Sequence, residues 1–228
     1  MTSCRGRICT HVWIKSLPIG DEMDKEQRPV TIVSSGYALQ ENSLYQTEPF
    51  GTLTLLRHLP DVSGWRIWEC AAGNHLMADV LREAGARVLT SDIAVYDHPH
   101  DYMIDFLKDP APLGRIDAIF TNPPYGASNL TARKFCERAL ERCAGWVAML
   151  MTDGFDCGST RTHLFRDNPR FHAKISFLDR LMWFPGPDAK TGTGDHAWFV
   201  WRPTSEECRP AQMYWASRAD VARMEECA

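Results

Sequence analysis

Apolar and polar positions alternate in blocks along most of the chain, and the period changes from one block to the next. Two segments, HLMADVLREAG (75–85) and ARKFCERALERC (132–143), carry apolar residues at helical spacing. The short apolar runs around them are typical of buried strands. These runs are RIWECA (66–71), ARVLTSDI (86–93), RIDAIFTNPPYG (115–126) and WVAMLM (146–151). Strands that alternate with helices predict a parallel sheet covered on both faces.

The pattern continues on both sides of this region. TLTLLRHL (52–59) predicts a helix that Pro60 ends, because proline cannot continue a helix. Two later runs, AKISFLDRLMWF (173–184) and HAWFVWRP (196–203), predict strands that flank a stretch rich in glycine and proline. The predicted fold class is therefore α/β, a doubly wound, mostly parallel sheet with an antiparallel final strand.

Length and composition fit one globular domain. The chain has 228 residues, of which 44% are hydrophobic and 24% charged, and these values exclude a fully disordered chain or a collagen-like repeat. We expect an N-terminal extension over 1–40, whose order is left open, a folded domain over 41–205 and a tail over 206–228. Both Met1 and Met23 are candidate starts of translation.

Charge and cysteine usage narrow the choice of partners and compartment. The formal net charge of −4 argues against coating of nucleic acid by bulk electrostatics and permits local contact. The sequence has no apolar run of about 18 residues, the length needed to span a membrane. Its first twenty residues make a poor signal peptide. The eight cysteines form no CxxC pair. We therefore expect a reduced, cytoplasmic protein that binds neither a membrane nor a metal.

In a doubly wound sheet, ligands bind beyond the carboxyl ends of the strands. The first such end is ECAAGN (69–74), where Glu69 can hold a cation and Ala71 and Gly73 let the backbone approach a ligand. The segment lacks both GxGxxG and the Lys and Ser/Thr of a P-loop. It predicts a ligand without a pyrophosphate, or else an ordinary tight turn between strand and helix.

An acidic residue ends the next predicted strand. Asp92 follows Gly73 by about 20 positions, the spacing of a carboxylate that accepts hydrogen bonds from ribose hydroxyls. Aspartate is also favoured at the N-cap of a helix. The ribose interpretation predicts that the ligand contains a nucleoside.

The most specific motif follows the third strand and consists of Asn122, Pro123, Pro124 and Tyr125. Two consecutive prolines fix the backbone and lack amide donors, so their carbonyls and the Asn122 side-chain oxygen become rigid acceptors. Tyr125 adds an aromatic face. This set suits a substrate with a planar NH₂ group, whereas the alternative is a proline-rich loop that arose by chance.

NPPY, the preceding glycine turn and the acidic strand end together resemble the S-adenosylmethionine-dependent N6-adenine DNA methyltransferases, over about residues 45–203. The short phage-type members are the most similar. The resemblance implies a Rossmann-like methyltransferase fold with a sheet of seven strands, S-adenosylmethionine as cofactor, and DNA as the partner. It also implies a set of cofactor-binding residues. This set comprises Tyr45, Thr47 and Pro49 of YQTEP, then Glu69, Ala71, Gly73, Asp92, Ile93, Asp105 and Phe106. The family's usual second glycine is absent, and His75 stands near its place.

The resemblance also implies a mechanism. Asn122 and the Pro123 carbonyl would accept the two N6 hydrogens of adenine and shift the nitrogen lone pair toward the cofactor methyl group. No strong base would be needed. Tyr125 would stack on an adenine flipped out of the duplex. Trp183 or Phe184 is a candidate for covering its other face, although aromatic residues at strand ends are more often core.

Contacts with nucleic acid must be local. Arg161, in a small basic group, and Lys190 are candidates, although each also fits a solvated surface. No separate recognition domain is visible, so sequence specificity would be carried by loops, be weak, or come from a partner protein. NPPY also serves enzymes that methylate RNA bases or glutamine amides. A catalytically silent module with the same fold is the remaining alternative.

Overall fold

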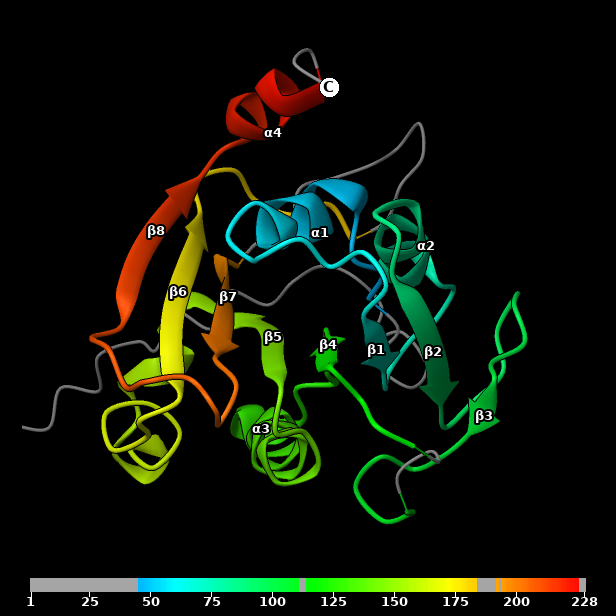
Figure 1. Ribbon diagram of the computed structural model, residues 1–228, viewed down its shortest axis with the longest axis horizontal. Coiled ribbons are helices and arrows are strands. Elements are labelled where there is room, and N and C mark those ends of the chain that lie inside the picture. The colour runs from blue at the N-terminus through cyan, green and yellow to red at the C-terminus, as the bar shows by residue number, and fades with distance from the viewer. Residues whose placement is uncertain (1–44, 111–113, 184–191, 193, 226–228) are drawn as a thin grey trace, which may run out of the picture. The chain divides into compact units, whose positions relative to one another are not determined.

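A computed structural model describes residues 45–110, 114–183, 192 and 194–225. All of them belong to one compact unit, Ser35–Ala228. Its strands form one sheet of eight (Figure 1): β1 (Arg66–Glu69), β2 (Arg87–Asp92), β3 (Tyr102–Met103), β4 (Ala118–Thr121), β5 (Trp146–Thr152), β6 (Phe171–Phe177), β7 (His196–Trp201) and β8 (Gln212–Ala216). The helices are α1 (Pro49–Leu56), α2 (Leu76–Glu83), α3 (Leu130–Arg142) and α4 (Arg218–Glu225).

The strand order is β3-β2-β1-β4-β5-β7-β6-β8. Strand β7 runs antiparallel to β5 and β6, and every other pair is parallel. The α/β, mostly parallel fold is thus confirmed. The strand count is corrected to eight, and the antiparallel strand is the penultimate one, because β8 pairs in parallel with β6. Strand order reverses at β1 and β4, the position where such sheets bind ligands.

Each face of the sheet carries its own hydrophobic core. Helices α1 and α2 pack on one face through residues such as Leu55 and Leu81. Helix α3 packs on the other through Phe135 and Ala139, and Figure 1 shows α1 and α3 on opposite sides. Side chains of β5, buried from Trp146 to Met151, alternate between the two cores, as a strand covered on both faces requires.

Helix boundaries follow from local chemistry. Helix α1 begins at Pro49, three residues before the predicted start, since a proline in the first turn has no amide to leave unpaired. Helix α2 ends before Gly85, whose φ of 85° suits a residue without a side chain. The Ala86 amide there donates to the Leu81 carbonyl oxygen.

The predicted strand over 173–184 is shorter than expected. Strand β6 ends at Phe177, and the chain then turns at Asp179 and Arg180. The Asp179 carboxylate accepts a hydrogen bond from the Arg218 amide, and Arg180 pairs with Asp195. The apolar residues that lengthened the predicted strand, Leu181 and Trp183, are buried in the core beside α1 instead.

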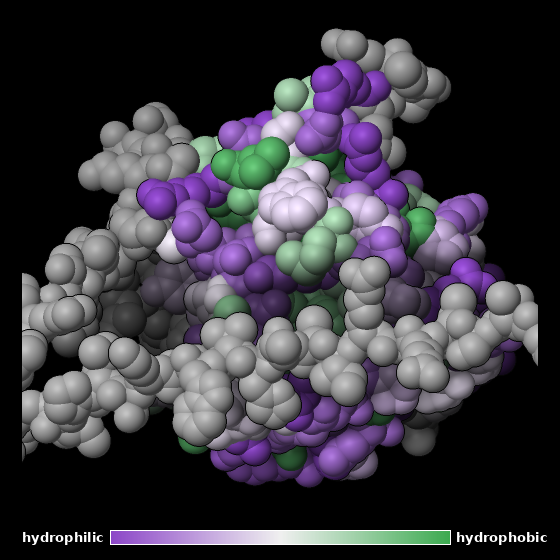
Figure 2. All heavy atoms as spheres, turned by 90° about the vertical axis from the view of Figure 1, so that its left-hand side faces the viewer, coloured by the Kyte–Doolittle hydropathy of each residue, from purple (hydrophilic) through white to green (hydrophobic). Residues whose placement is uncertain are grey.

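Residues 206–228, expected as a tail, contain β8 and α4. Arg218 donates two hydrogen bonds to the buried Glu48 carboxylate, at 2.6 and 2.8 Å, and its guanidinium lies 4.5 Å from the centre of the Phe50 ring. Figure 2 views the molecule from the β8 side, where apolar patches interrupt a hydrophilic surface. Leu178, Met213 and Trp215 are exposed at this edge. The expected extension over 1–40, with Met23, lies outside the described residues.

Candidate functional site

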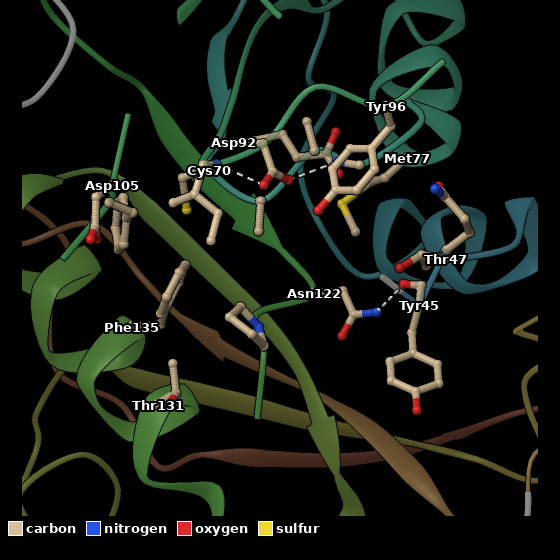
Figure 3. Close-up of a pocket in the computed structure, with 18 of the residues that line it drawn as sticks. Tyr45, Thr47, Cys70, Met77, Asp92, Tyr96, Asp105, Asn122, Thr131 and Phe135 are labelled. Atoms are coloured by element: carbon tan, nitrogen blue, oxygen red, sulfur yellow. Dashed lines mark hydrogen bonds between the residues drawn. The ribbon is translucent and has the colours of Figure 1, made fainter. Parts of the chain in front are cut away.

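A cavity of about 230 Å³ opens at the carboxyl ends of β1, β2 and β4 (Figure 3). It brings together most of the residues proposed for cofactor binding. Its lining includes Tyr45, Thr47, Glu69, Ala71, Gly73, Asp92, Ile93, Asp105 and Phe106, together with Asn122 and Pro124 of NPPY. Pro49 lies apart, at the start of α1. The lining residues that the sequence did not single out include Gln46, Met77, Tyr96, Thr131 and Phe135.

Asp92 joins the first two strand ends. One of its carboxylate oxygens accepts a hydrogen bond from the Gly73 amide at 3.0 Å. The other accepts one from the Ile93 amide at 2.7 Å and a longer one from the Ala94 amide at 3.4 Å. Because each carboxylate oxygen has two lone pairs, these bonds fix the side chain, and the oxygen bonded to Gly73 keeps acceptor capacity. The Asp92 side chain, which lines the cavity, can therefore accept a hydrogen bond from a ligand hydroxyl group.

Glu69 is only 3% exposed, and one of its carboxylate oxygens has no hydrogen-bond partner among the described residues. Burial raises the pKa of this carboxyl well above its ordinary value, and the nearby Asp92 adds to the shift while Arg82 opposes it. An unpaired carboxylate inside a protein is costly. The site therefore favours a ligand that brings a positive charge to Glu69.

Asp105 and Phe106 lie in the turn after β3. Asp105 is held by the Lys108 ammonium group, 2.7 Å away, and this hydrogen bond lowers the pKa of the carboxyl. The buried Phe106 ring stacks on Phe135 of α3 with centroids 4.8 Å apart and meets Trp68 edge-on at 5.1 Å. Two rigid rings in the wall suit a flat heterocycle that lies along it.

The Asn122 side chain has a defined orientation. Its amide nitrogen donates to the Tyr45 carbonyl oxygen at 3.0 Å, as Figure 3 shows. Because the nitrogen is engaged in this way, the amide oxygen is the group left to accept a hydrogen bond from a ligand. The cavity lining and NPPY thus share two residues, Asn122 and Pro124.

Tyr125 does not line this cavity. Its ring packs against the α3-side core, and its hydroxyl group donates to the Leu150 carbonyl oxygen at 3.4 Å. Burial raises the pKa of the hydroxyl. On one side, the ring faces His196 with centroids 6.0 Å apart and planes at 28°. Sequence reasoning missed His196, because a histidine that begins a strand carries no signal of what it will face.

His196 links Tyr125 to Trp183. The Trp183 ring stands edge-on to His196 at 4.8 Å and to Tyr45 at 6.1 Å. Burial lowers the pKa of His196 to about 4, so the ring is neutral at pH 7. Trp183, proposed to cover a substrate base, thus lies beside the NPPY segment, and Tyr125, His196, Trp183 and Tyr45 form an aromatic cluster there.

Arg161, proposed to contact nucleic acid, does not line the cavity. Its guanidinium lies 4.5 Å from the centre of the Phe155 ring, on a short 3₁₀ turn after β5. Phe184 and Lys190 lie outside the described residues. Arg170, which follows Arg161 in the chain, donates to the carbonyl oxygens of Leu140, Gly145 and Arg202. Arg170 is therefore engaged in structure.

The described residues contain no cluster of three His, Cys, Asp or Glu residues that could hold a metal ion. None of their helices is long and apolar enough to cross a membrane.

No protein-family profile matches this sequence, and no curated protein matches it. Solved structures do. One is a protein from Pyrococcus horikoshii described as a candidate RNA methyltransferase, with a TM-score of 0.53 and 15% identity over 72% of this chain and 90% of that chain. Another is the modification subunit of a candidate type I restriction enzyme from Vibrio vulnificus YJ016, with a TM-score of 0.51 and 13% identity over 80% of this chain and 51% of that chain. The chain therefore has the Rossmann-like methyltransferase fold that its sequence predicted.

Proposed function

We propose that this protein is an S-adenosylmethionine-dependent methyltransferase that methylates the exocyclic N6 amine of adenine in DNA. The observation that carries the proposal is the orientation of Asn122. Its amide nitrogen is held by the Tyr45 carbonyl oxygen, so its amide oxygen is the acceptor at the edge of the cavity. An amino group bound there would lie beside whatever the cavity holds.

The cavity residues fit S-adenosylmethionine. The buried Glu69 oxygen without a partner suits the cationic amino acid part of this cofactor. Asp92 would accept hydrogen bonds from the ribose hydroxyls, and Phe106 and Ile93 would contact the adenine ring. Asp105 would accept a hydrogen bond from the cofactor's exocyclic amine. When bound, the cofactor supplies an electrophilic methyl group.

The NPPY residues would prepare the substrate nitrogen. The lone pair of an aromatic amine is conjugated into its ring, which makes the amine a poor nucleophile. Hydrogen bonds from its two N–H groups to the Asn122 oxygen and the Pro123 carbonyl would draw charge onto the nitrogen. They would also stabilise the positive charge that develops during transfer. The Pro123–Pro124 pair holds both acceptors rigid.

Extrusion of the base and binding of the polymer are separate requirements. Flipping costs a few kcal/mol, and stacking on Tyr125 can return about 1–3 kcal/mol. DNA is the proposed polymer because the segment order most resembles the DNA adenine enzymes. RNA is the second candidate, since the Pyrococcus horikoshii structure is described as a candidate RNA methyltransferase.

The test uses cofactor with a tritiated methyl group. The protein is incubated separately with duplex DNA, single-stranded DNA, ribosomal RNA and transfer RNA, and the labelled nucleoside is identified after digestion. N6-methyldeoxyadenosine is expected. Label that appears only in RNA would replace DNA with RNA as substrate, and label only in protein would overturn both.

A matched pair of variants tests the site. Asn122→Ala should abolish transfer and keep cofactor binding. Asn168→Ala is the control. The Asn168 side chain bonds only to the nearby backbone of His163 and Arg170, so this variant should keep both transfer and cofactor binding. Full activity of Asn122→Ala would contradict the assignment of NPPY.

A further inference from the structure

The outer edge of β8 is open to pairing with another strand. Strand β8 is one edge of the sheet and pairs with β6 alone among the described strands (Figure 1). The opposite edge strand, β3, is only two residues long, and very short edges resist pairing with other chains. In contrast, β8 has five residues, Gln212–Ala216, without a charge, a proline or a bulge among them. It therefore lacks the features by which proteins protect an exposed edge.

Hydrogen bonding shows which backbone groups of β8 face outward. The Ala216 carbonyl oxygen accepts a hydrogen bond from the Leu178 amide, which lies on the β6 side. Because the backbone groups of successive residues in a strand point to opposite sides, Met213 and Trp215 direct their N–H and C=O groups away from β6. No described residue bonds to the backbone of either one. The edge thus offers donors and acceptors at alternate positions.

The side chains of this edge are also suited to contact. Tyr214 packs against the core on the α1 side, where its ring lies against His58 with centroids 4.4 Å apart. Met213 and Trp215 alternate with Tyr214 and so point to the opposite face of the sheet. There they are 49% and 62% exposed. Exposed apolar side chains that share one face mark an interaction site, whereas scattered ones do not.

We propose that β8 pairs antiparallel with β8 of a second copy of this chain, so that the sheets of two molecules join into one. A twofold axis at Tyr214, the middle of the strand, gives full overlap of the two strands. In this register Met213 of each copy stands opposite Trp215 of the other. Opposed residues whose backbone groups face each other exchange both bonds, so the dimer gains about four main-chain hydrogen bonds.

The edge is complementary to itself, which favours a second copy over a different partner. Met213 opposite Trp215 places a thioether beside an aromatic ring, a favourable contact. The axis sets the two Tyr214 rings beside each other on the other face, as a cross-strand aromatic pair. Because Gln212–Ala216 carries no charge, no like charges meet across the axis. An acidic or basic peptide would find no opposite charge on the strand.

Sedimentation velocity of the full chain, from about 1 to 100 μM, measures the association. We expect a reversible equilibrium between monomer and dimer with a dissociation constant in the micromolar range, because an interface of one strand is small. A monomer over the whole concentration range would overturn the proposal.

Two matched substitutions locate the contact. Met213→Lys puts a charge on the free edge, as protected edges do, and should weaken the dimer at least tenfold. Met103→Lys is the control, because Met103 is exposed to a similar extent, 53%, on β3 at the opposite edge. The control should leave the dimer unchanged. Equal effects of the two substitutions, or no effect of either, would contradict the assignment to β8.

Met213→Pro separates strand pairing from apolar contact. Proline removes one outward N–H group and is tolerated on edge strands where that group points away from the sheet. The variant should weaken the dimer at least tenfold and keep a urea midpoint near that of wild type. A folded Met213→Pro protein that still dimerises like wild type would show that the strands do not pair.

Amide hydrogen exchange tests the same point in wild type, without relying on the fold of a variant. Exchange in 212–216 should slow as the protein concentration rises from about 1 to 100 μM, because outward N–H groups become bonded in the dimer. A dimer that forms without slower exchange in this segment would refute the joining of the sheets.

Discussion

Tyr125 and His196 face each other across the end of the sheet as nearly parallel rings, and the Tyr125 hydroxyl group is anchored to the Leu150 carbonyl oxygen. The backbone of β5 and the start of β7 thereby hold the aromatic residue of NPPY from two directions. Tyr125 is therefore fixed in advance, and under the proposed function an incoming base would meet a ring that has no freedom left to lose.

Stability should depend on pH through His196. Burial lowers the pKa of this histidine to about 4, while the unfolded chain titrates near 6.5. As pH falls from about 6.5 to 4, the unfolded state takes up a proton that the folded state does not. Linkage then removes stability, about 2 kcal/mol between pH 7 and pH 5.

Urea unfolding of wild type and His196→Phe at both pH values measures this effect. Phenylalanine keeps a ring opposite Tyr125 and does not titrate, so the variant should lose about 2 kcal/mol less than wild type on acidification. Equal losses in the two proteins would show that His196 is already protonated, or equally exposed, in the folded state.

Glu69 should matter to the cofactor more than to the fold. Glu69→Gln keeps the shape of the side chain and removes the charge that faces the cavity. We expect cofactor affinity to fall at least tenfold. Because burial raises the pKa of Glu69, ionisation of this group destabilises the empty fold above pH about 4.5. The variant should therefore unfold at an equal or higher urea concentration.

Calorimetry with the cofactor measures the affinity, and urea titration of the empty protein measures the stability. Asp79→Asn serves as the control, because Asp79 is an exposed acid on α2 that pairs with Arg82. A loss of stability in Glu69→Gln, with unchanged affinity, would assign Glu69 to the core alone.

The two groups of Tyr125 should have different effects on transfer. Tyr125→Phe removes only the long hydroxyl contact with Leu150 and should keep most of the activity. Tyr125→Ala removes the stacking face, about 1–3 kcal/mol, and should lower kcat/KM for the nucleic acid about tenfold to a hundredfold. Steady-state kinetics on the labelled substrate measures kcat/KM for both variants. Similar activity in the two would show that the base does not stack on Tyr125.

Arg170 should prove structural. It donates to three carbonyl oxygens at 2.6–3.1 Å, which belong to the end of α3, the segment before β5 and the residue after β7. Arg170→Ala leaves these acceptors without their donor and should cost about 3 kcal/mol of unfolding free energy. The exposed pair of Arg166 with Asp167 offers the control, since Arg166→Ala should change stability by under about 0.5 kcal/mol.

The elements that the sequence predicted correctly are those whose side chains face one environment throughout. Strand β5 is apolar at almost every position, and α3 repeats buried residues at helical spacing. Strands β3 and β8 escaped prediction because their residues are mostly exposed and their pairing is decided by their neighbours. The 173–184 run was predicted too long because buried irregular chain at Leu181 and Trp183 has the same composition as a strand.

The residues of the candidate site were also predictable only in part. Asp92 and Asn122 could be placed beforehand, because Asp92 ends β2 and Asn122 directly follows β4, and the carboxyl ends of these parallel strands lie at one edge of the sheet. His75 and His196 could not be assigned roles, because their partners are distant in the sequence. His75 bonds to His100, 25 positions along the chain, and His196 faces Tyr125, which follows a different strand. Contacts of this kind depend on how loops pack, which local pattern does not encode.

The pairing of Arg218 with Glu48 also affects when the segment beside the cavity can be held in place during synthesis of the chain. Glu48 is the residue before α1, in the segment that carries Tyr45 and Thr47 to the cavity, and 170 positions separate the two partners. Ribosomes add about 5–20 residues per second, so roughly 10–30 s pass between the synthesis of Glu48 and that of Arg218. During that interval its carboxylate has no Arg218 to neutralise it, and the segment beside the cavity lacks this clamp. A nascent chain of this protein should therefore complete this cavity late, after α4 has been synthesised.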